Sequence, residues 1–434
     1  MAVTQTFKGG IHPREVGNGK SASQSQTIVN VTSPARVTIP MSMHVGAPAK
    51  CCVKVGQNVS LGQLIGEAQG FISAPVHASV SGKVIALTTA PLASGKTCPA
   101  VVIENDFLDT WDENCKPYPE TPEGIVEAAK NCGVVGIGGA AFPTHVKLNT
   151  TSLDPKPDTL VVNGSECEPY LTSDHRIMVE CAAEVADGIR LAMKASGCTS
   201  AYVGIEDNKM DAVEALKAQA GSDFEVVALP AKYPQGFEKM LIYALTGRRV
   251  PNGALPSAAK CVTMNVGTCL ALSQAVRSGR PLIDRVVTVN GRVGNPGNFR
   301  VRIGMPLMDL LDLAGGVNKE TRKLIIGGAM MGTAVPKANL YVTKNFGGVV
   351  ALADEGLSPK ETACIRCGRC LRACPMRLMP TTIDAYVRRA DYDGAIAAGA
   401  LNCMECGSCT YVCPAKRELT QSIRMAKLVA RSKK

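Results

Sequence analysis

CIRCGRCLRACP at residues 364–375 and CMECGSCTYVCP at residues 403–414 share one spacing of cysteines, C-x2-C-x2-C-x3-C-P. In each run the first three thiolates line a tight loop and can take three corners of one cubane cluster, whereas the fourth serves the other cluster. We expect the fourth cysteine to begin a helix that points toward the other loop. The spacing predicts two [4Fe–4S] clusters in a helical, ferredoxin-like domain, with the ligand sets Cys364, Cys367, Cys370 with Cys413, and Cys403, Cys406, Cys409 with Cys374.

Structural zinc is the alternative for these cysteines. Zinc usually takes its ligands as two C-x2-C pairs rather than as one run of four cysteines. The repetition of the whole run after 39 residues therefore favours iron–sulfur clusters.

Basic residues are concentrated around the same motif. From Lys360 to Lys434 there are 14 Lys and Arg against 6 Asp and Glu, a surplus of 8 out of the net charge of +10 of the whole chain. A cluster with four thiolates is anionic, so nearby cations stabilise its reduced state. The alternative is an ordinary solvated basic face, and no nucleic-acid partner is expected from so local a surplus. The residues in or beside the loops are Arg366, Arg369, Arg372, Arg377, Lys416 and Arg417.

Length and composition indicate a multidomain globular protein. The chain has 434 residues, 46% hydrophobic and 19% charged, which excludes a disordered chain and suggests about three domains. Its 18 cysteines, without a secretory signal at the start, point to a reducing compartment and to thiols that bind metal or stay free. Because no uniformly apolar run of about 18 residues occurs, we expect no membrane-spanning helix.

Four segments follow from the patterning. Residues 1–118 contain short, glycine-broken apolar stretches, as in Val53–Leu87, which predict a small β-sandwich or barrel. Residues 119–281 alternate strands and helices, including helices at Met210–Ala220 and Gly236–Leu245, which predicts a mostly parallel sheet covered by helices. Residues 282–353 form a small α+β module. Asp354–Thr362 is the predicted linker to the cysteine-rich domain, residues 354–434.

A glycine-rich stretch, GVVGIGGAAFPTHVKL at residues 133–148, opens the α/β segment. Its glycines let the backbone approach a ligand closely, and its N–H groups can point at a phosphate. Taken alone, the glycine run is weak evidence for a ligand and favours a plain structural turn.

Four motifs in the same order resemble the flavin-bearing, NADH-binding subunit of respiratory complex I. The glycine-rich stretch resembles GRGGAGFPTG, VVNGSECEPYL at 161–171 resembles VVNADEGEPGT, YPQGFEKML at 233–241 resembles YICGEETAL, and TMNVGTCL at 263–270 resembles TVNNVETL. The module after Asp284 is similar to the β-grasp-like (SLBB) domain of that subunit. The resemblance implies a Rossmann-like domain that binds FMN and NAD(H).

The resemblance assigns cofactor binding to Gly136, Gly138, Gly139, Phe142, Lys147, Asn163, Glu166, Glu168, Tyr233, Gly236, Glu238, Asn265 and Thr268. Glu166 and Glu168 would face the flavin and nucleotide, and Tyr233 would close the other side of the pocket. The chain departs from the family at Ile137, Ala141, Ser165 and Phe237, which implies a more apolar pocket. Cys167, between the two glutamates, is the one cysteine outside the cluster runs that we single out; the other nine are expected to be buried free thiols.

The combination of a flavin domain with two cluster runs resembles the C subunits of the Rnf complexes. The start agrees, with TFKGGIHP at 6–13, HVGAPAK at 44–50 and SAPVHASVSGKV at 73–84, and implies an N-terminal barrel-sandwich domain. The family is a membrane-bound, ion-translocating ferredoxin:NAD⁺ oxidoreductase. The resemblance implies a peripheral subunit on the cytoplasmic face of the cell membrane. It would exchange hydride with NAD(H) at FMN and pass single electrons through two clusters. Its partners would be the other subunits, with ferredoxin reached indirectly. Hydride transfer needs no acid–base residue, so no catalytic residue is assigned.

Two alternatives remain open. A cobalamin-reducing flavoprotein of diol-degrading microcompartments shares the glycine loop and the two cluster runs, but its barrel-sandwich segment is expected at the other end of the chain. A relay that holds two clusters but no flavin would explain the departures at Ala141, Ser165 and Phe237. The basic amphipathic stretch Ser422–Lys434 could contact anionic lipid, contact an acidic partner, or form a solvated terminal helix.

Overall fold

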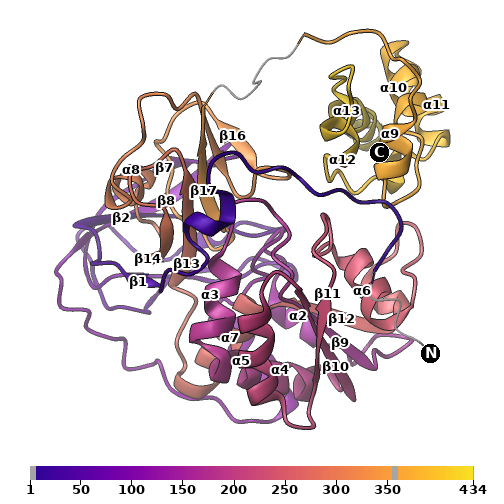
Figure 1. The fold of residues 1–434 in the computed structure, drawn as a ribbon. Helices are drawn as coiled ribbons and strands as arrows, with labels where there is room; N and C mark the ends of the chain where they lie inside the picture. Colours follow the sequence, from indigo (N-terminus) through magenta and orange to yellow (C-terminus); the bar gives the residue numbers. More distant parts are fainter. Residues whose placement is uncertain (1–5, 354–359, 434) are drawn as a thin grey trace.

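The computed structural model describes residues 6–353 and 360–433, and a parallel four-stranded sheet lies at the lower right of Figure 1. The strand order is β11 (Glu225–Leu229), β10 (Ser200–Glu206), β9 (Thr159–Asn163), β12 (Cys261–Asn265). Successive residues of β9 face opposite hydrophobic cores, Leu160 and Val162 toward one and Val161 toward the other. A sheet buried on both faces accounts for the continuous apolar run in this strand.

Helices cover both faces of this sheet. The larger core is built by α1 (Pro122–Asn131), α4 (Ala182–Ser196), α5 (Met210–Ala220) and α7 (Val266–Ser278), and α6 (Glu238–Thr246) covers the other face. The predicted alternation of strands and helices is confirmed, and the bounds of α5 are those expected from its sequence pattern. The short α2 (Thr144–Leu148) and α3 (Ser173–Glu180) follow the glycine loop and β9.

The carboxyl ends of β9 and β12 lie next to each other. Asn163 and Asn265 end these strands and are partners in the parallel register. In open α/β sheets, ligands bind outside the carboxyl ends of the strands. The fold therefore gathers the two asparagines where a nucleotide would be expected.

The N-terminal region contains two small antiparallel sheets. One has the order β2 (Arg36–Pro40), β8 (Thr97–Asn105), β7 (Gly82–Pro91), β4 (Asn58–Val59), and the other β3 (Lys50–Cys51), β5 (Leu64–Glu67), β6 (Val76–His77). Residues 6–30 take no part in these sheets. Instead η1 (Gly19–Ala22) and β1 (Val29–Asn30) lie against the following module, where β1 pairs with β14.

The α+β module forms a six-stranded sheet. Its order is β1, β14 (Gly297–Arg302), β13 (Asp284–Gly291), β17 (Gly348–Leu352), β15 (Lys323–Ile326), β16 (Thr333–Val335), and α8 (Leu307–Leu313) packs on it. The two strands and short helix expected here are confirmed. Most of the predicted linker that follows, residues 354–359, lies outside the described residues.

The C-terminal domain is helical and is set apart from the rest of the molecule in Figure 1, with the N-terminal arm running to it. It contains α9 (Arg369–Ala373), α10 (Pro380–Arg388), α11 (Tyr392–Ala397), η3 (Ala400–Asn402), α12 (Ser408–Tyr411) and α13 (Leu419–Ser432). α10 and α11 form the expected helical connection between the two cysteine runs. The fourth cysteines do not begin helices. Cys374 and Cys413 follow the ends of α9 and α12, because Pro375 and Pro414 start turns there.

Within residues 6–353 and 360–433, no helix combines the length and the apolar composition that crossing a bilayer requires.

Candidate functional site: two cysteine groups and a pocket at the sheet edge

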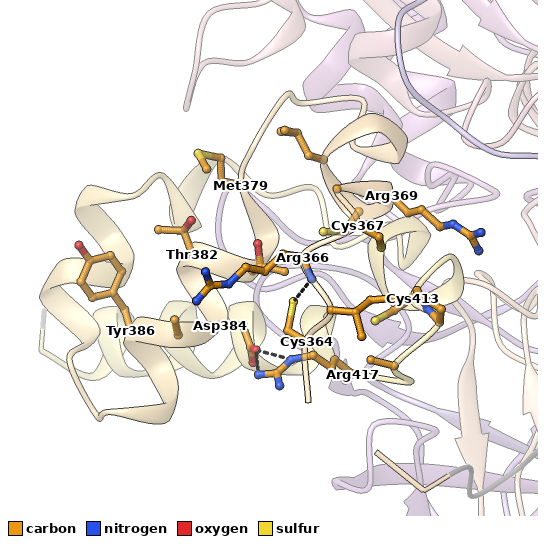
Figure 2. Close-up of a pocket in the computed structure, with 18 of the residues that line it drawn as sticks. Cys364, Arg366, Cys367, Arg369, Met379, Thr382, Asp384, Tyr386, Cys413 and Arg417 are labelled. Carbon is orange, nitrogen blue, oxygen red and sulfur yellow. Dashed lines mark hydrogen bonds and ion pairs between the residues drawn. The ribbon is translucent and has the colours of Figure 1, made fainter. Parts of the chain in front are cut away.

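Cysteines from both runs line one cavity of about 590 Å³ in the C-terminal domain (Figure 2). Cys364, Cys367 and Cys370 come from the first run, and Cys413 comes from the second. Burial, followed by the neighbouring Cys413, raises the pKa of the Cys370 thiol. Cys364 and Cys367 are exposed. We call these four cysteines the outer group.

The remaining four cysteines form a second set on the side facing the body of the protein. Burial raises the pKa of Cys409 to about 11, and the nearby Cys406 and Cys374 add to this rise. Burial also raises the pKa of Cys403 to about 12, again with Cys409 and Cys406 as neighbours. Cys374, Cys406 and Cys409 are buried. We call this set the inner group. The structure thus brings the fourth cysteine of each run toward the other run.

The donor chemistry of both groups fits iron–sulfur clusters. Each group offers four thiols, and the carboxylate that lines the cavity of the outer group, Asp384, is paired with Arg417. That cavity is far larger than one metal ion. Because burial holds the inner thiols protonated, binding of iron by their thiolates must release protons. Among the described residues, no three His, Cys, Asp or Glu side chains are grouped as a single metal ion requires.

Backbone N–H groups already point at several sulfurs. Arg366 donates to Cys364 Sγ at 3.4 Å, Leu378 to Cys374 Sγ at 3.4 Å, and Glu405 to Cys403 Sγ at 3.3 Å. Hydrogen bonds to cluster sulfurs are one of the protein's means of setting a reduction potential.

Exposed cations lie beside the two cysteine runs, four of them near the outer group and Arg377 next to Cys374 of the inner group. Arg366, Arg369, Arg372, Arg377 and Lys416 are all exposed, and we call them the basic surface. Arg417 has another role. Its guanidinium pairs with the buried carboxylate of Asp384 (Figure 2). Against the effect of burial, hydrogen bonds from the Ser422 hydroxyl, then from Arg417 and Arg388, hold the pKa of Asp384 below its usual value. Arg417 thus supports α10 rather than the surface.

The glycine loop lies against the carboxyl ends of β9 and β12. The backbone N–H of Ile137 donates to Thr268 Oγ1 at 2.8 Å, and a Cβ on Gly138 would lie 3.2 Å from Asn265 Nδ2. Gly138 has a φ of +79°, which favours glycine. A Cβ on Gly139 would meet nothing within 4 Å. The loop therefore leaves open backbone beside the two asparagines, which we call the cradle of the candidate flavin pocket; backbone that no side chain covers fits the close approach of a flavin.

Side-chain contacts from three elements border the candidate pocket. Asn163 Nδ2 donates to the carbonyl of Gly236 at 2.8 Å. Lys147 Nζ, on α2, lies 3.3 Å from Glu238 Oε1 at the start of α6, and donates to the carbonyl of Thr263 at 3.2 Å. Asn265 Oδ1 caps α7 by accepting the N–H of Gly267 at 2.8 Å. Gly136 and Phe142 share a backbone hydrogen bond that closes the base of the loop, at 2.8 Å.

A buried polar network behind the pocket has no clear signal in the sequence. Glu166 accepts the N–H groups of Asp174 and His175 at 2.7 and 3.2 Å, so its carboxylate caps α3. Asn265 Nδ2 donates to Asp174 Oδ2 at 2.6 Å. Burial raises the pKa of both Glu166 and Asp174 and lowers that of Lys209, which donates to the carbonyl of Ser165. Only tertiary packing brings these side chains together.

Two of the residues assigned to the pocket turn to other partners. Glu168 accepts the N–H groups of Met330 and Met331, both at 2.9 Å, in the loop between β15 and β16. The hydroxyl of Tyr233 donates to the carbonyl of Cys406 at 2.7 Å. Cys167 accepts the N–H of Gly236 at 3.3 Å, and burial raises its pKa to about 12, so it is an inert thiol at neutral pH.

Family models match the chain in four consecutive regions. They are the RnfC barrel sandwich hybrid domain (residues 5–108), the Nuo51 FMN-binding domain (129–274), the SLBB domain (286–334) and the 4Fe-4S dicluster domain (358–414). The chain is therefore a mixed α/β protein with these domains in this order. A crystal structure of an NAD⁺-reducing [NiFe]-hydrogenase in the H₂-reduced state has a similar fold. It has a TM-score of 0.51 and 20% identity, and the match covers 72% of this chain and 62% of that chain.

Curated relatives match almost the whole chain. The C subunit of the Na⁺-translocating ferredoxin:NAD⁺ oxidoreductase complex of Acetobacterium woodii is 47% identical over 97% of this chain and 96% of its own length. The proton-translocating counterpart of Clostridium ljungdahlii is 44% identical over 98% and 94%. The C subunit of the ion-translocating oxidoreductase complex of Rhodobacter capsulatus is 42% identical over 97% and 82%. The family expected from the sequence motifs is thus confirmed, and the chain belongs to the C subunits of the ion-translocating ferredoxin:NAD⁺ oxidoreductase (Rnf) complexes.

Proposed function

We propose that this chain exchanges hydride with NAD(H) at an FMN held in the sheet-edge pocket and relays single electrons through two [4Fe–4S] clusters. One observation carries the proposal. The inner cysteine group is hydrogen-bonded, through Tyr233 and Cys406, to the same short segment whose Gly236 contacts Asn163 in the pocket. Pocket and cysteines are therefore adjoining parts of one continuous path.

FMN, when bound, supplies the conversion between a two-electron hydride and single electrons. The chain's own residues bind and orient it. The cradle at Gly138 and Gly139 admits the ring system to the backbone, and Asn163 and Asn265 offer amide groups at the strand ends. The N-terminus of α7, which Asn265 caps, suits the flavin phosphate. Lys147 provides a cation at the opposite wall. Eleven of the thirteen pocket assignments from the sequence remain cofactor contacts in this proposal, whereas the side chains of Glu168 and Tyr233 bind backbone groups of other domains instead.

The order of the clusters follows from burial. The inner group, Cys403, Cys406, Cys409 with Cys374, adjoins the pocket and would exchange electrons with the flavin. The outer group, Cys364, Cys367, Cys370 with Cys413, is more exposed and would exchange electrons with a partner. The basic surface around the outer group supports an acidic electron-transfer partner, because complementary charge steers encounter.

The setting we propose is a peripheral position on the cytoplasmic face of the cell membrane. There the other subunits would pass electrons from ferredoxin to the outer group, and NAD⁺ would be reduced at the pocket. The names of the relatives, which belong to ion-translocating complexes, support this setting. The four-domain division at residues 118, 281 and 353 belongs to the same proposal, and the order of the matched family models supports it.

Filling the cradle tests the pocket. Gly139→Leu projects a side chain into space where a Cβ meets nothing within 4 Å, so the chain should fold. A matched control is Gly347→Leu, where a Cβ meets only Leu171 Cδ1 at 3.9 Å. We expect wild type and control to bind about one FMN per chain, and Gly139→Leu to bind none while keeping its iron. Equal FMN binding by Gly139→Leu and wild type would contradict the assignment of the pocket.

A further inference from the structure

A short N-terminal strap, residues Phe7–Ile11, runs between the α/β domain and the cysteine-rich domain (Figure 1). Ile11 and Tyr233 exchange two backbone hydrogen bonds, at 2.8 and 2.9 Å. Lys232 Nζ donates to the carbonyl of Phe7 at 2.6 Å and lies 4.4 Å from the centre of its ring. The strap is therefore fixed to the segment that leads into the pocket.

The same strap touches the inner cysteine group. The N–H of Gly10 donates to the carbonyl of Ala373 at 2.8 Å, directly before Cys374. A Cβ on Gly9 would lie 2.7 Å from the carbonyl oxygen of Cys374. Contact this close requires glycine, and the φ of +84° at Gly9 favours it as well.

Tyr233 contacts the inner cysteine group at a second point. Its ring is only 2% exposed, and its hydroxyl reaches the carbonyl of Cys406 in the second cysteine run. Ile11, Tyr233, Ala373 and Cys406 form one small hydrophobic cluster. Strap and tyrosine thus hold the inner group at two points, one in each cysteine run that supplies its ligands.

We propose that Tyr233 and the Gly9–Gly10 strap are positioning elements that fix the inner cluster at electron-transfer distance from the flavin pocket. This inference rests on the proposed function and adds to it a role for residues outside the cofactor contacts. The contacts of the strap and of Tyr233 join the segment that leads into the pocket to both cysteine runs of the inner group. Tyr233 does so with its hydroxyl, and the strap with its backbone.

The test separates flavin reduction from cluster reduction in the full chain carrying FMN and clusters. NADH is mixed rapidly with wild type, Tyr233→Phe and Gly9→Ala without oxygen, and flavin and cluster absorbance are followed. We expect the flavin phase to be unchanged and the cluster phase to slow about fivefold, which corresponds to about 1 kcal/mol of lost docking. Unchanged cluster reduction in both variants would overturn the inference.

Matched controls share the chemistry but not the contact. Tyr202→Phe removes a hydroxyl in β10, from a ring that packs on the core beneath α6. Gly17→Ala places a methyl at a φ of +69° in the same N-terminal arm, where a Cβ meets nothing within 4 Å. Both controls should reduce their clusters at the wild-type rate.

Hydrogen exchange gives a reading that does not depend on NADH. Amides of the strap should exchange about fivefold faster in Tyr233→Phe and Gly9→Ala than in the two controls. Equal strap exchange in all four proteins refutes the positioning role. If NADH fails to reduce the flavin of the wild type while strap exchange still differs as expected, the proposed function is wrong, but the role of the strap and Tyr233 in positioning the inner group is supported.

Discussion

Lys344 offers a prediction that follows from burial alone. Its side chain is 1% exposed, and Nζ donates to the carbonyls of Pro75 and Gly133, both at 2.7 Å. The three residues belong to the barrel-sandwich region, the glycine-loop region and the β-grasp-like module, so the ammonium group ties three parts of the chain together. Burial lowers the pKa of Lys344 from 10.5 to about 7. Its titratable neighbours are Cys132, His77 and His44.

The pH dependence follows from linkage. Because the pKa in the folded chain lies below that in the unfolded chain, the unfolded chain binds more protons between about pH 7 and pH 10.5. Stability must therefore rise with pH across this window, and it is lost as the pH falls toward 7. From pH 7 to pH 9, the two pKa values give a gain of about 2 kcal/mol in the free energy of unfolding.

Lys344→Met isolates this effect. The variant keeps an apolar side chain and removes the titrating group. Its free energy of unfolding should therefore not show this rise between pH 7 and pH 9, although the two carbonyls left without a donor destabilise the variant at both pH values. For an unfolding unit of about 150–250 residues, the gain corresponds to roughly 4–8 °C in Tm. Thermal unfolding of both proteins at pH 7 and pH 9 measures it. An identical change in Tm between pH 7 and pH 9 in wild type and Lys344→Met would show that Lys344 is not the group responsible.

Three further predictions concern the site. Cys374→Ala should disturb the inner cluster and stop NADH from reducing either cluster, whereas Cys413→Ala should alter only the outer cluster. Electron paramagnetic resonance distinguishes the two clusters. Loss of only the outer-cluster signal in Cys374→Ala would contradict the assigned ligand sets. Thr268→Val leaves the buried N–H of Ile137 without its acceptor, so FMN affinity, measured by fluorescence titration, should fall at least about fivefold with iron content unchanged; equal affinity would count against the loop geometry. Arg369→Glu should weaken binding to the membrane subunits most at low salt, and a salt-independent affinity would argue against electrostatic docking.

Local patterns anticipated the elements well. The amphipathic spacing of α5 and the apolar run of β9 reflect interactions within or next to each element, so the sequence alone carries them. The cysteine spacing also anticipated that each fourth cysteine approaches the other run. The same spacing did not show that Cys374 follows a helix, because Pro375 opens a turn there.

The contacts between domains could not be predicted from the sequence pattern. Glu168 and Tyr233 lie in motifs of the pocket, but their side chains meet backbone groups of Met330, Met331 and Cys406, far away in the chain. At Ala141 the residue type departs from the family, but the backbone conformation does not. Its φ of +54° keeps the backbone conformation of the glycine expected at this position, although the residue has changed.

An anaerobic titration of the cluster-replete, FMN-loaded chain with NADH tests the central claim most directly. Absorbance is followed in the flavin and iron–sulfur bands. We expect stoichiometric NADH to bleach the flavin and cluster absorbance to fall with it, because the proposed path from the pocket to the inner group lies within this chain. Intact clusters and bound flavin that NADH leaves unchanged would contradict it.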